Sequence, residues 1–149
     1  MDSIVAPEGT SATSLMRLKI PPRESGINRL APRNSLLEWQ ISRVREYIDA
    51  HIGSRILVSD LSHIAQRSEV HFNRAFKRTF GETPHAYLIR LRLELASRAK
   101  LASNAPLTDI ALTCGFADQA HLCRLFRRWT GRTPAAWRLD PYQPWGASI

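Results

Sequence analysis

One segment of this chain occurs twice, and the repeat constrains the fold more than any other feature of the sequence. Residues 71–87 read HFNRAFKRTFGETPHAY, and residues 121–137 read HLCRLFRRWTGRTPAAW. Eight of the seventeen aligned positions are identical: His71/His121, Arg74/Arg124, Phe76/Phe126, Arg78/Arg128, Gly81/Gly131, Thr83/Thr133, Pro84/Pro134 and Ala86/Ala136. A repeated segment predicts a repeated structural unit. We therefore expect two copies of one small supersecondary unit.

The residues at the centre of the repeat are typical of one helix ending and another beginning. Gly81 suits the left-handed position that ends a helix. Thr83 offers a side-chain oxygen as the next N-cap, and Pro84 suits the first helical turn, where no amide donor is needed. The second copy has the same Gly-x-Thr-Pro pattern. Each copy is therefore predicted to be a cationic helix followed directly by another helix.

Apolar residues outside the repeat also recur at helical spacing, and no alternating strand pattern is present. A first helix is predicted to start from a capping box of Ser35 and Glu38 and to end near Gly53. Its apolar face is predicted to contain Leu37, Ile41, Val44, Ile48 and Ile52. A second helix is predicted over 59–65, and a third begins after Ser68 and buries Phe72, Ala75 and Phe76. A long helix over 85–102 is predicted to pack against neighbours on two sides, with one apolar face of Tyr87, Leu88, Leu91, Leu95, Ala96, Ala99 and Ala102, and with Ile89, Leu93 and Leu101 on other sides.

The predicted fold is all-α, with two similar lobes joined by a long helix. The length of 149 residues fits one domain. We expect the following organisation along the chain: a flexible N-terminal arm (1–34), a first lobe (35–84), a linker helix (85–102), a second lobe (103–140) and a C-terminal tail (141–149). The arm is too short to bury the core of a further domain, so the chain is expected to be either a stand-alone protein or a fragment.

Charge and composition favour a polyanionic partner and disfavour several other classes. The net charge of +8 is typical of nucleic-acid binding, because each neutralised phosphate releases counterions. No apolar run approaches the ~20 residues that span a bilayer, and the N-terminus lacks a signal-peptide pattern. Two cysteines cannot form a disulfide framework, so a cytoplasmic location is expected. The sequence contains no discernible catalytic set, cofactor loop, metal site or effector site, and we do not expect an enzyme.

The buried residues of each cationic helix define its outward face, since successive residues are turned by about 100°. Arg suits guanine, and Asn or Gln suits adenine, so such faces can read bases in a major groove. The candidate base-contacting residues are Val70, His71, Asn73, Arg74, Lys77, Gln119, Ala120, His121, Cys123 and Arg124. The candidate phosphate-contacting residues are Ser68, Arg78, Thr83, Arg127, Arg128 and Thr133.

Residues 35–140 resemble the DNA-binding domain of AraC/XylS-type bacterial transcription regulators. The stretch IALTCGFADQAHLCRLFRRWTGRTPAAWR carries the resemblance most clearly, and LSHIAQRSEVHFNRAFKRTFGETPHAYLIRLRLELA matches as well. The resemblance implies seven helices in two homeodomain-like helix-turn-helix subdomains. It also implies recognition helices over about 69–80 and 118–130, which enter successive major grooves of double-stranded DNA. The expected function is that of a sequence-specific regulator, in particular an activator that contacts RNA polymerase and binds DNA as a monomer.

Two departures from the family pattern affect this interpretation. Gln66 stands where the first helix-turn-helix turn usually has glycine, so that turn is expected to be strained or differently shaped. Ala120 and Cys123 stand where the second recognition helix often has polar residues. We therefore expect the first unit to discriminate sequence more sharply, and the second to depend more on phosphate contacts. Equal costs of base substitutions in both halves of a bound site would contradict this asymmetry.

Two other interpretations remain open at the level of sequence, and a third is disfavoured. The chain could be a helical adaptor or anti-regulator that binds RNA polymerase or another regulator, and a large exposed apolar patch would favour that. It could also be an architectural DNA-binding protein, which would bind random duplexes equally well. A zinc site at Cys114, His121 and Cys123 is disfavoured, because these residues are predicted to lie on different helix faces.

Overall fold

The computed structural model describes residues 34–139, and within that range the chain forms α-helices and no strands. The helices are α1 (Glu38–His51), α2 (Val58–Ile64), α3 (Glu69–Phe80), α4 (Pro84–Ala102), α5 (Leu107–Thr113), α6 (Gln119–Thr130) and α7 (Pro134–Leu139). The prediction of an all-α fold with seven helices is confirmed. The arm and tail predicted for residues 1–34 and 141–149 lie outside the described residues, apart from Asn34. None of the described helices is both long and apolar enough to cross a bilayer.

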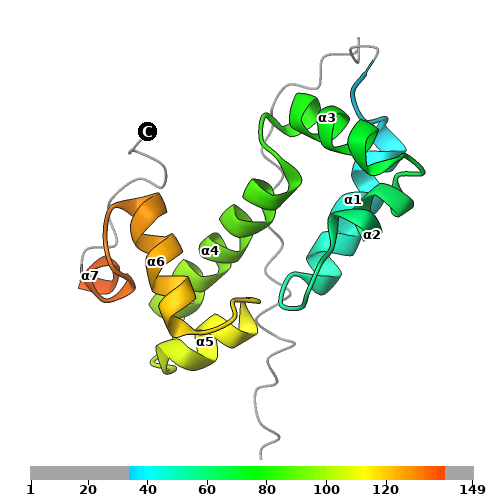
Figure 1. The fold of residues 1–149 in the computed structure, drawn as a ribbon. Coiled ribbons are helices and arrows are strands. Elements are labelled where there is room, and N and C mark those ends of the chain that lie inside the picture. The colour runs from blue at the N-terminus through cyan, green and yellow to red at the C-terminus, as the bar shows by residue number, and fades with distance from the viewer. Residues whose placement is uncertain (1–33, 140–149) are drawn as a thin grey trace, which may run out of the picture.

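The helices form two lobes connected by α4, which runs diagonally between them (Figure 1). Helices α1–α3 form the lobe at the first end of α4, where α3 contacts α4, and helices α5–α7 all contact its other end. Each lobe has its own hydrophobic core. The first contains the fully buried Phe72 and Phe76, and the second contains Leu122 and Phe126. Only the side of α4 near Leu95 packs against both cores among the described residues.

The predicted transitions from one helix to the next are confirmed in both copies of the repeat. Gly81 and Gly131 have φ angles of 79° and 74°, the left-handed conformation that ends α3 and α6. Thr83 Oγ1 accepts a hydrogen bond from the Ala86 amide (3.3 Å) at the start of α4. In the second copy, Thr133 accepts from Ala136 (3.2 Å) at the start of α7. These local rules turn the chain sharply after each cationic helix.

The predicted start of the first helix is wrong. The capping box does not form at Ser35; instead the helix begins at Glu38, and Gln40 Oε1 accepts from the Leu37 amide (2.9 Å). The Gln40 amide also donates to the Ala65 carbonyl (2.6 Å), which ties the start of α1 to the end of α2. This later start leaves Leu37 49% exposed, contrary to prediction, and Leu36 occupies the core instead.

The predicted apolar face of the long helix is only partly buried: Leu95 and Ala99 are half-buried, whereas Leu93, predicted on another side, is fully buried in the second core. Tyr87, Leu88 and Leu91 lie in the first core, and Ala96 lies in the second. Ala102 is exposed, contrary to prediction, because α4 ends there and the chain leaves the second core.

Candidate nucleic-acid interface

The outward face of α3 is formed by the residues that the sequence predicts. Ser68 caps the helix by accepting from the His71 amide (3.4 Å). Because Phe72, Ala75 and Phe76 face the core, the residues between them point outward. The exposed side chains on or beside α3 are those of Ser68, Glu69, Val70, His71, Asn73, Arg74, Lys77 and Arg78. The face combines cationic groups with one amide, and Val70 is 61% exposed beside them.

The corresponding face of α6 has as many exposed lysine and arginine side chains as that of α3, but fewer other side chains that can distinguish bases. Leu122 and Phe126 are buried, which places Gln119, Ala120, Arg124, Arg127 and Arg128 on the exposed side. His121 and Cys123 are half-buried at the edge of this face. Gln119 is partly committed within the lobe, because the Thr108 hydroxyl of α5 donates to its Oε1 (3.0 Å).

The repeated histidines both contact the residues that precede their helices. The Ser68 hydroxyl lies 2.8 Å from His71 Nδ1. In the second copy, the Ala117 amide donates to His121 Nδ1 (3.3 Å), and the imidazole packs edge-on against Phe116, with centroids 5.6 Å apart. The shared position of these imidazoles therefore has a structural explanation, because each one contacts a residue just before its own helix.

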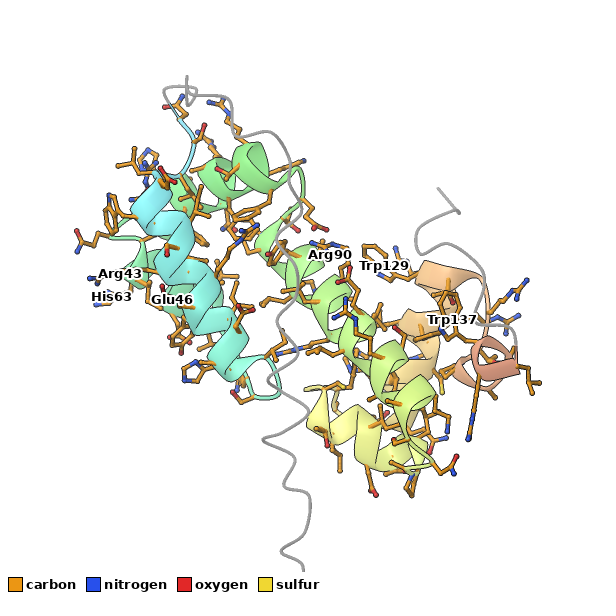
Figure 2. The ribbon with its side chains drawn as sticks, turned by 180° about the vertical axis from the view of Figure 1, so that it is seen from behind. Arg43, Glu46, His63, Arg90, Trp129 and Trp137 are labelled. Carbon is orange, nitrogen blue, oxygen red and sulfur yellow. The ribbon has the colours of Figure 1, made fainter. Side chains whose placement is uncertain are left out.

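A cationic cleft that the sequence did not indicate adjoins the start of α3. Its volume is about 550 Å³, and it is lined by Arg43, His63, Ile64, Gln66, Arg67 and Ser68. Arg43 of α1 and His63 of α2 lie beside each other at this edge of the lobe (Figure 2). The cleft was missed because Arg43 is distant from α3 in sequence, and no local pattern shows that it lies beside His63. Only the packing of α1 against α2, through Gln40 and Ala65, brings them to the helix-turn-helix turn.

One cation of the linker helix, Arg90, forms its contacts within the protein. The Arg90 guanidinium forms ion pairs with Glu82 (2.7 Å) and Glu94 (2.8 Å) and lies over the Tyr87 ring, 4.9 Å from its centroid. Burial lowers the pKa of Arg90, but the hydrogen bonds to the two carboxylates and their negative charges together outweigh it, and the pKa is raised overall. This charge holds the turn after α3 to the linker helix.

The two cysteines occupy different environments. Cys114 is buried in the second core, and this burial raises the pKa of its thiol to about 11. Cys123 is half-buried on α6. Among residues 34–139, no three or more His, Cys, Asp or Glu side chains gather in a group that could hold a metal ion.

Comparison with known proteins identifies relatives in transcription regulation. Residues 61–140 match a helix-turn-helix domain family. The chain is 35% identical over 96 residues to LumQ, a probable transcriptional regulator from Photobacterium leiognathi, covering 64% of this chain and 39% of LumQ. It is 31% identical over 113 residues to AdaA of Bacillus subtilis, a bifunctional transcriptional activator and DNA repair enzyme. That match covers 74% of this chain and 53% of AdaA. The matched region thus spans about half or less of these two relatives.

Solved structures show the same architecture. The DNA-binding domain of the global transcriptional factor AdpA, crystallised with a target DNA, superposes with a TM-score of 0.64 at 28% identity. That match covers 70% of this chain and 98% of the AdpA domain. A regulator with an AraC-type DNA-binding domain from Chromobacterium violaceum also gives a TM-score of 0.64, at 25% identity, covering 70% of this chain and 94% of that one.

Proposed function

The chain belongs to the AraC-type helix-turn-helix family of DNA-binding transcription regulators, and on that premise we propose that it is a sequence-specific activator. Helices α3 and α6 enter successive major grooves of one duplex, and a single copy of the chain occupies both. Consecutive major grooves on one face of B-DNA lie about 34 Å apart, so straight DNA must bend if the helices sit closer than that.

The observation that carries this proposal is the presence of two exposed cationic helix faces, each backed by a separate core. Arg74 and Lys77 on α3, and Arg124 and Arg127 on α6, are all exposed. Arginine side chains on a helix in the major groove can bond guanine edges in pairs, and cations near the groove edges neutralise phosphates. Each face can therefore supply both affinity and base recognition.

We assign the residues of the two faces to two roles. The base-contacting residues are Val70, His71, Asn73, Arg74, Lys77, Gln119, Ala120, His121, Cys123 and Arg124. The phosphate-contacting residues are Ser68, Arg78, Thr83, Arg127, Arg128 and Thr133, to which the cleft adds Arg43, His63 and Arg67. The first unit discriminates bases more sharply, because Asn73 is exposed on α3 whereas its counterpart on α6 is the half-buried Cys123.

The distribution of exposed apolar residues favours DNA over a protein partner at these faces. An adaptor or anti-regulator would need a continuous apolar surface. The large exposed apolar side chains of the described residues are distributed over several elements: Leu37, Trp39, Leu57, Val70, Leu112 and Leu139. Contact with RNA polymerase is part of the activator proposal and uses a surface away from α3 and α6.

Selection of bound duplexes from a random pool, followed by footprinting, tests the proposal. We expect one protected stretch of about two helical turns that contains two enriched sequence blocks. Binding without enrichment would instead support an architectural role. Absence of DNA binding by the folded protein would contradict the proposal and favour the adaptor interpretation.

Substitution of Arg74 tests the assignment of base contacts. Arg74→Ala should weaken binding by about 1–3 kcal/mol and relax the preference at one or two base pairs. Arg78→Ala should weaken binding to all sequences alike and reduce the salt slope by about one. Arg55→Ala, in the loop between α1 and α2, is the matched control for loss of one surface cation. Uniform weakening by Arg74→Ala, measured by titration against single-base variants of the site, would place Arg74 on a phosphate.

A further inference from the structure

The second helix-turn-helix turn touches the first lobe directly. Gly115, between α5 and α6, has φ 82°, and a Cβ atom at this residue would lie 2.7 Å from the Ile52 carbonyl oxygen. The same Cβ atom would lie 2.9 Å from Arg92 Nε on α4. Real Cβ atoms do not approach other atoms so closely, since both distances are shorter than van der Waals contact. The backbone at Gly115 therefore fits against the first lobe only because this residue lacks a side chain.

Arg92 holds the first lobe at the same point. Its Nε–H donates to the Ile52 carbonyl (3.0 Å), and its Nη2–H donates to the Ser54 carbonyl (2.7 Å). Both carbonyls lie just beyond the end of α1, where no helical partner satisfies them. A guanidinium with two aligned donors holds such a pair of acceptors in a defined geometry. Three elements thus meet here: the end of α1, the linker helix and the second helix-turn-helix turn.

Comparison with the other turns shows that the close approach is specific to Gly115. Gly81 and Gly131 have similar positive φ angles, but a Cβ atom at either would meet nothing within 4 Å. The matching residue of the first helix-turn-helix turn is Gln66, which is exposed and has φ 53°. A non-glycine residue is therefore accommodated by the same bend in the first lobe. At Gly115, glycine is needed because the Ile52 carbonyl of the first lobe lies where a Cβ atom would be.

A small pocket lies at the junction beside this contact. Its volume is about 80 Å³, and it is lined from both lobes by residues that include Ile52, Leu95, Ile110 and Cys114. The two cores are otherwise separate clusters. A junction with a cavity resists rotation less than a close-packed one, because its lining atoms lack contacts on one side. The orientation of the lobes therefore depends strongly on the contact at Gly115 and Arg92.

We propose that Gly115 and Arg92 are positioning residues that fix the separation and angle between α3 and α6, and so determine which operator spacing the protein accepts. This inference rests on the proposed function, in which both helices bind one duplex. The linker helix provides one connection between the lobes, and the contact at Ile52 provides a second. Two connections prevent the lobes from pivoting about α4, so the recognition helices meet the grooves at one fixed spacing.

Three variants separate this role from the general cost of changing a glycine. Gly115→Ala incurs both the left-handed backbone penalty and the clash with Ile52. Gly131→Ala incurs the same backbone penalty in open space and is the matched control. Arg92→Met keeps the apolar stem and removes both donors. Circular dichroism establishes that each variant is folded; if Gly115→Ala does not fold, Arg92→Met alone carries the test.

The first measurement needs no DNA. Spin labels are attached through Val70→Cys on α3 and Ala120→Cys on α6, in a Cys123→Ser background in which buried Cys114 does not react. We expect a single narrow distance distribution for the parent protein and for Gly131→Ala. Gly115→Ala should lengthen the distance, and Arg92→Met should broaden the distribution. Distributions unchanged by both substitutions would overturn the inference, whatever the DNA measurements give.

The second measurement uses unlabelled protein and duplexes whose two blocks are separated by different numbers of base pairs. Adding two base pairs turns one block by about 70° around the duplex, so the parent should prefer its own spacing, and this preference should fall about tenfold in Gly115→Ala and Arg92→Met. Gly131→Ala should retain the preference. A preference unchanged in folded Gly115→Ala and Arg92→Met would overturn the inference. If the parent binds two blocks no more tightly than one, the two-groove function fails, while the label distances still test the positioning role.

Discussion

Gln66 and Gly115 occupy equivalent positions in the two helix-turn-helix turns and adopt the same left-handed backbone, with φ angles of 53° and 82°. The strain expected at Gln66 from the sequence is confirmed, but the shape of the turn is preserved. The amides after the bend still bond back to α2, with Gln66 donating to His63 (2.9 Å) and Arg67 donating to Ser62 (2.9 Å). Glutamine is tolerated there because its side chain points into solvent.

Replacing Gln66 by glycine should stabilise the protein. A left-handed residue with a Cβ atom costs roughly 1–2 kcal/mol, whereas the greater backbone freedom of glycine in the unfolded chain costs about 0.5–1 kcal/mol. Gln66→Gly should therefore raise the free energy of unfolding by about 0.5–1 kcal/mol in urea titrations. Gln66→Ala removes the same side-chain atoms but keeps the Cβ atom, so it should give no gain. Equal stabilities for the glycine and alanine variants would contradict the strain argument.

At the scale of elements, the two recognition helices are alike in length and termination but differ in how they begin. Both have twelve residues and end at a left-handed glycine. Ser68 Oγ is 3.4 Å from the amide that it caps in α3, whereas Asp118 Oδ1 is 2.7 Å from the equivalent amide in α6. A carboxylate at a helix N-terminus also interacts favourably with the helix dipole. The second recognition helix therefore has the stronger cap.

Removal of the Asp118 cap should destabilise the second lobe. Asp118→Ala leaves the His121 amide without its side-chain acceptor and should lower the free energy of unfolding by about 1 kcal/mol. Asp118→Asn keeps an acceptor oxygen at the same place and should lie close to the parent protein. The comparison is made by urea denaturation followed through circular dichroism. An asparagine variant as unstable as the alanine variant would show that the cap contributes little.

At the scale of the whole molecule, the chain consists of two separately cored lobes with a limited junction. Phe76 and Phe126 are equivalent in the repeat, and each is fully buried within its own lobe. Leu95 of α4 packs against both clusters, and Gly115 and Arg92 supply the direct contact between lobes. We therefore expect a packing defect in one core to have little effect on the other.

A cavity in one core should therefore loosen one lobe selectively. Phe126→Ala should cost about 3–5 kcal/mol of local stability, because the large side chain leaves a void. Hydrogen exchange measured by mass spectrometry should then rise in α5, α6 and α7, while α1–α3 retain their protection. Phe76→Ala is the matched variant and should give the opposite pattern. Equal loss of protection in both lobes from either change would indicate one cooperative unit.

Much of the fold follows from the sequence because it depends on local rules. The pattern Gly81, Thr83, Pro84 specifies the end of one helix and the start of the next without reference to the rest of the chain. The spacing of Phe72, Ala75 and Phe76 fixes which face of α3 is buried, and hence which residues are exposed. The same rules hold for the second copy of the repeat. The repeat therefore predicted both lobes and the exposed faces of both α3 and α6.

The features that only the tertiary structure decided all depend on contacts between residues distant in sequence. The start of α1 was mispredicted because Gln40 bonds to the Ala65 carbonyl of α2, a partner that no local pattern identifies. Arg43 and His63 line one cleft because the packing of α1 against α2 brings them together. In the sequence, Gly115 looks like an ordinary turn glycine. Only the structure shows that the Ile52 carbonyl lies against it. Periodicity determines which residues face inward within a helix, but the approach of one helix to another depends on the shapes of both surfaces, which packing alone brings together.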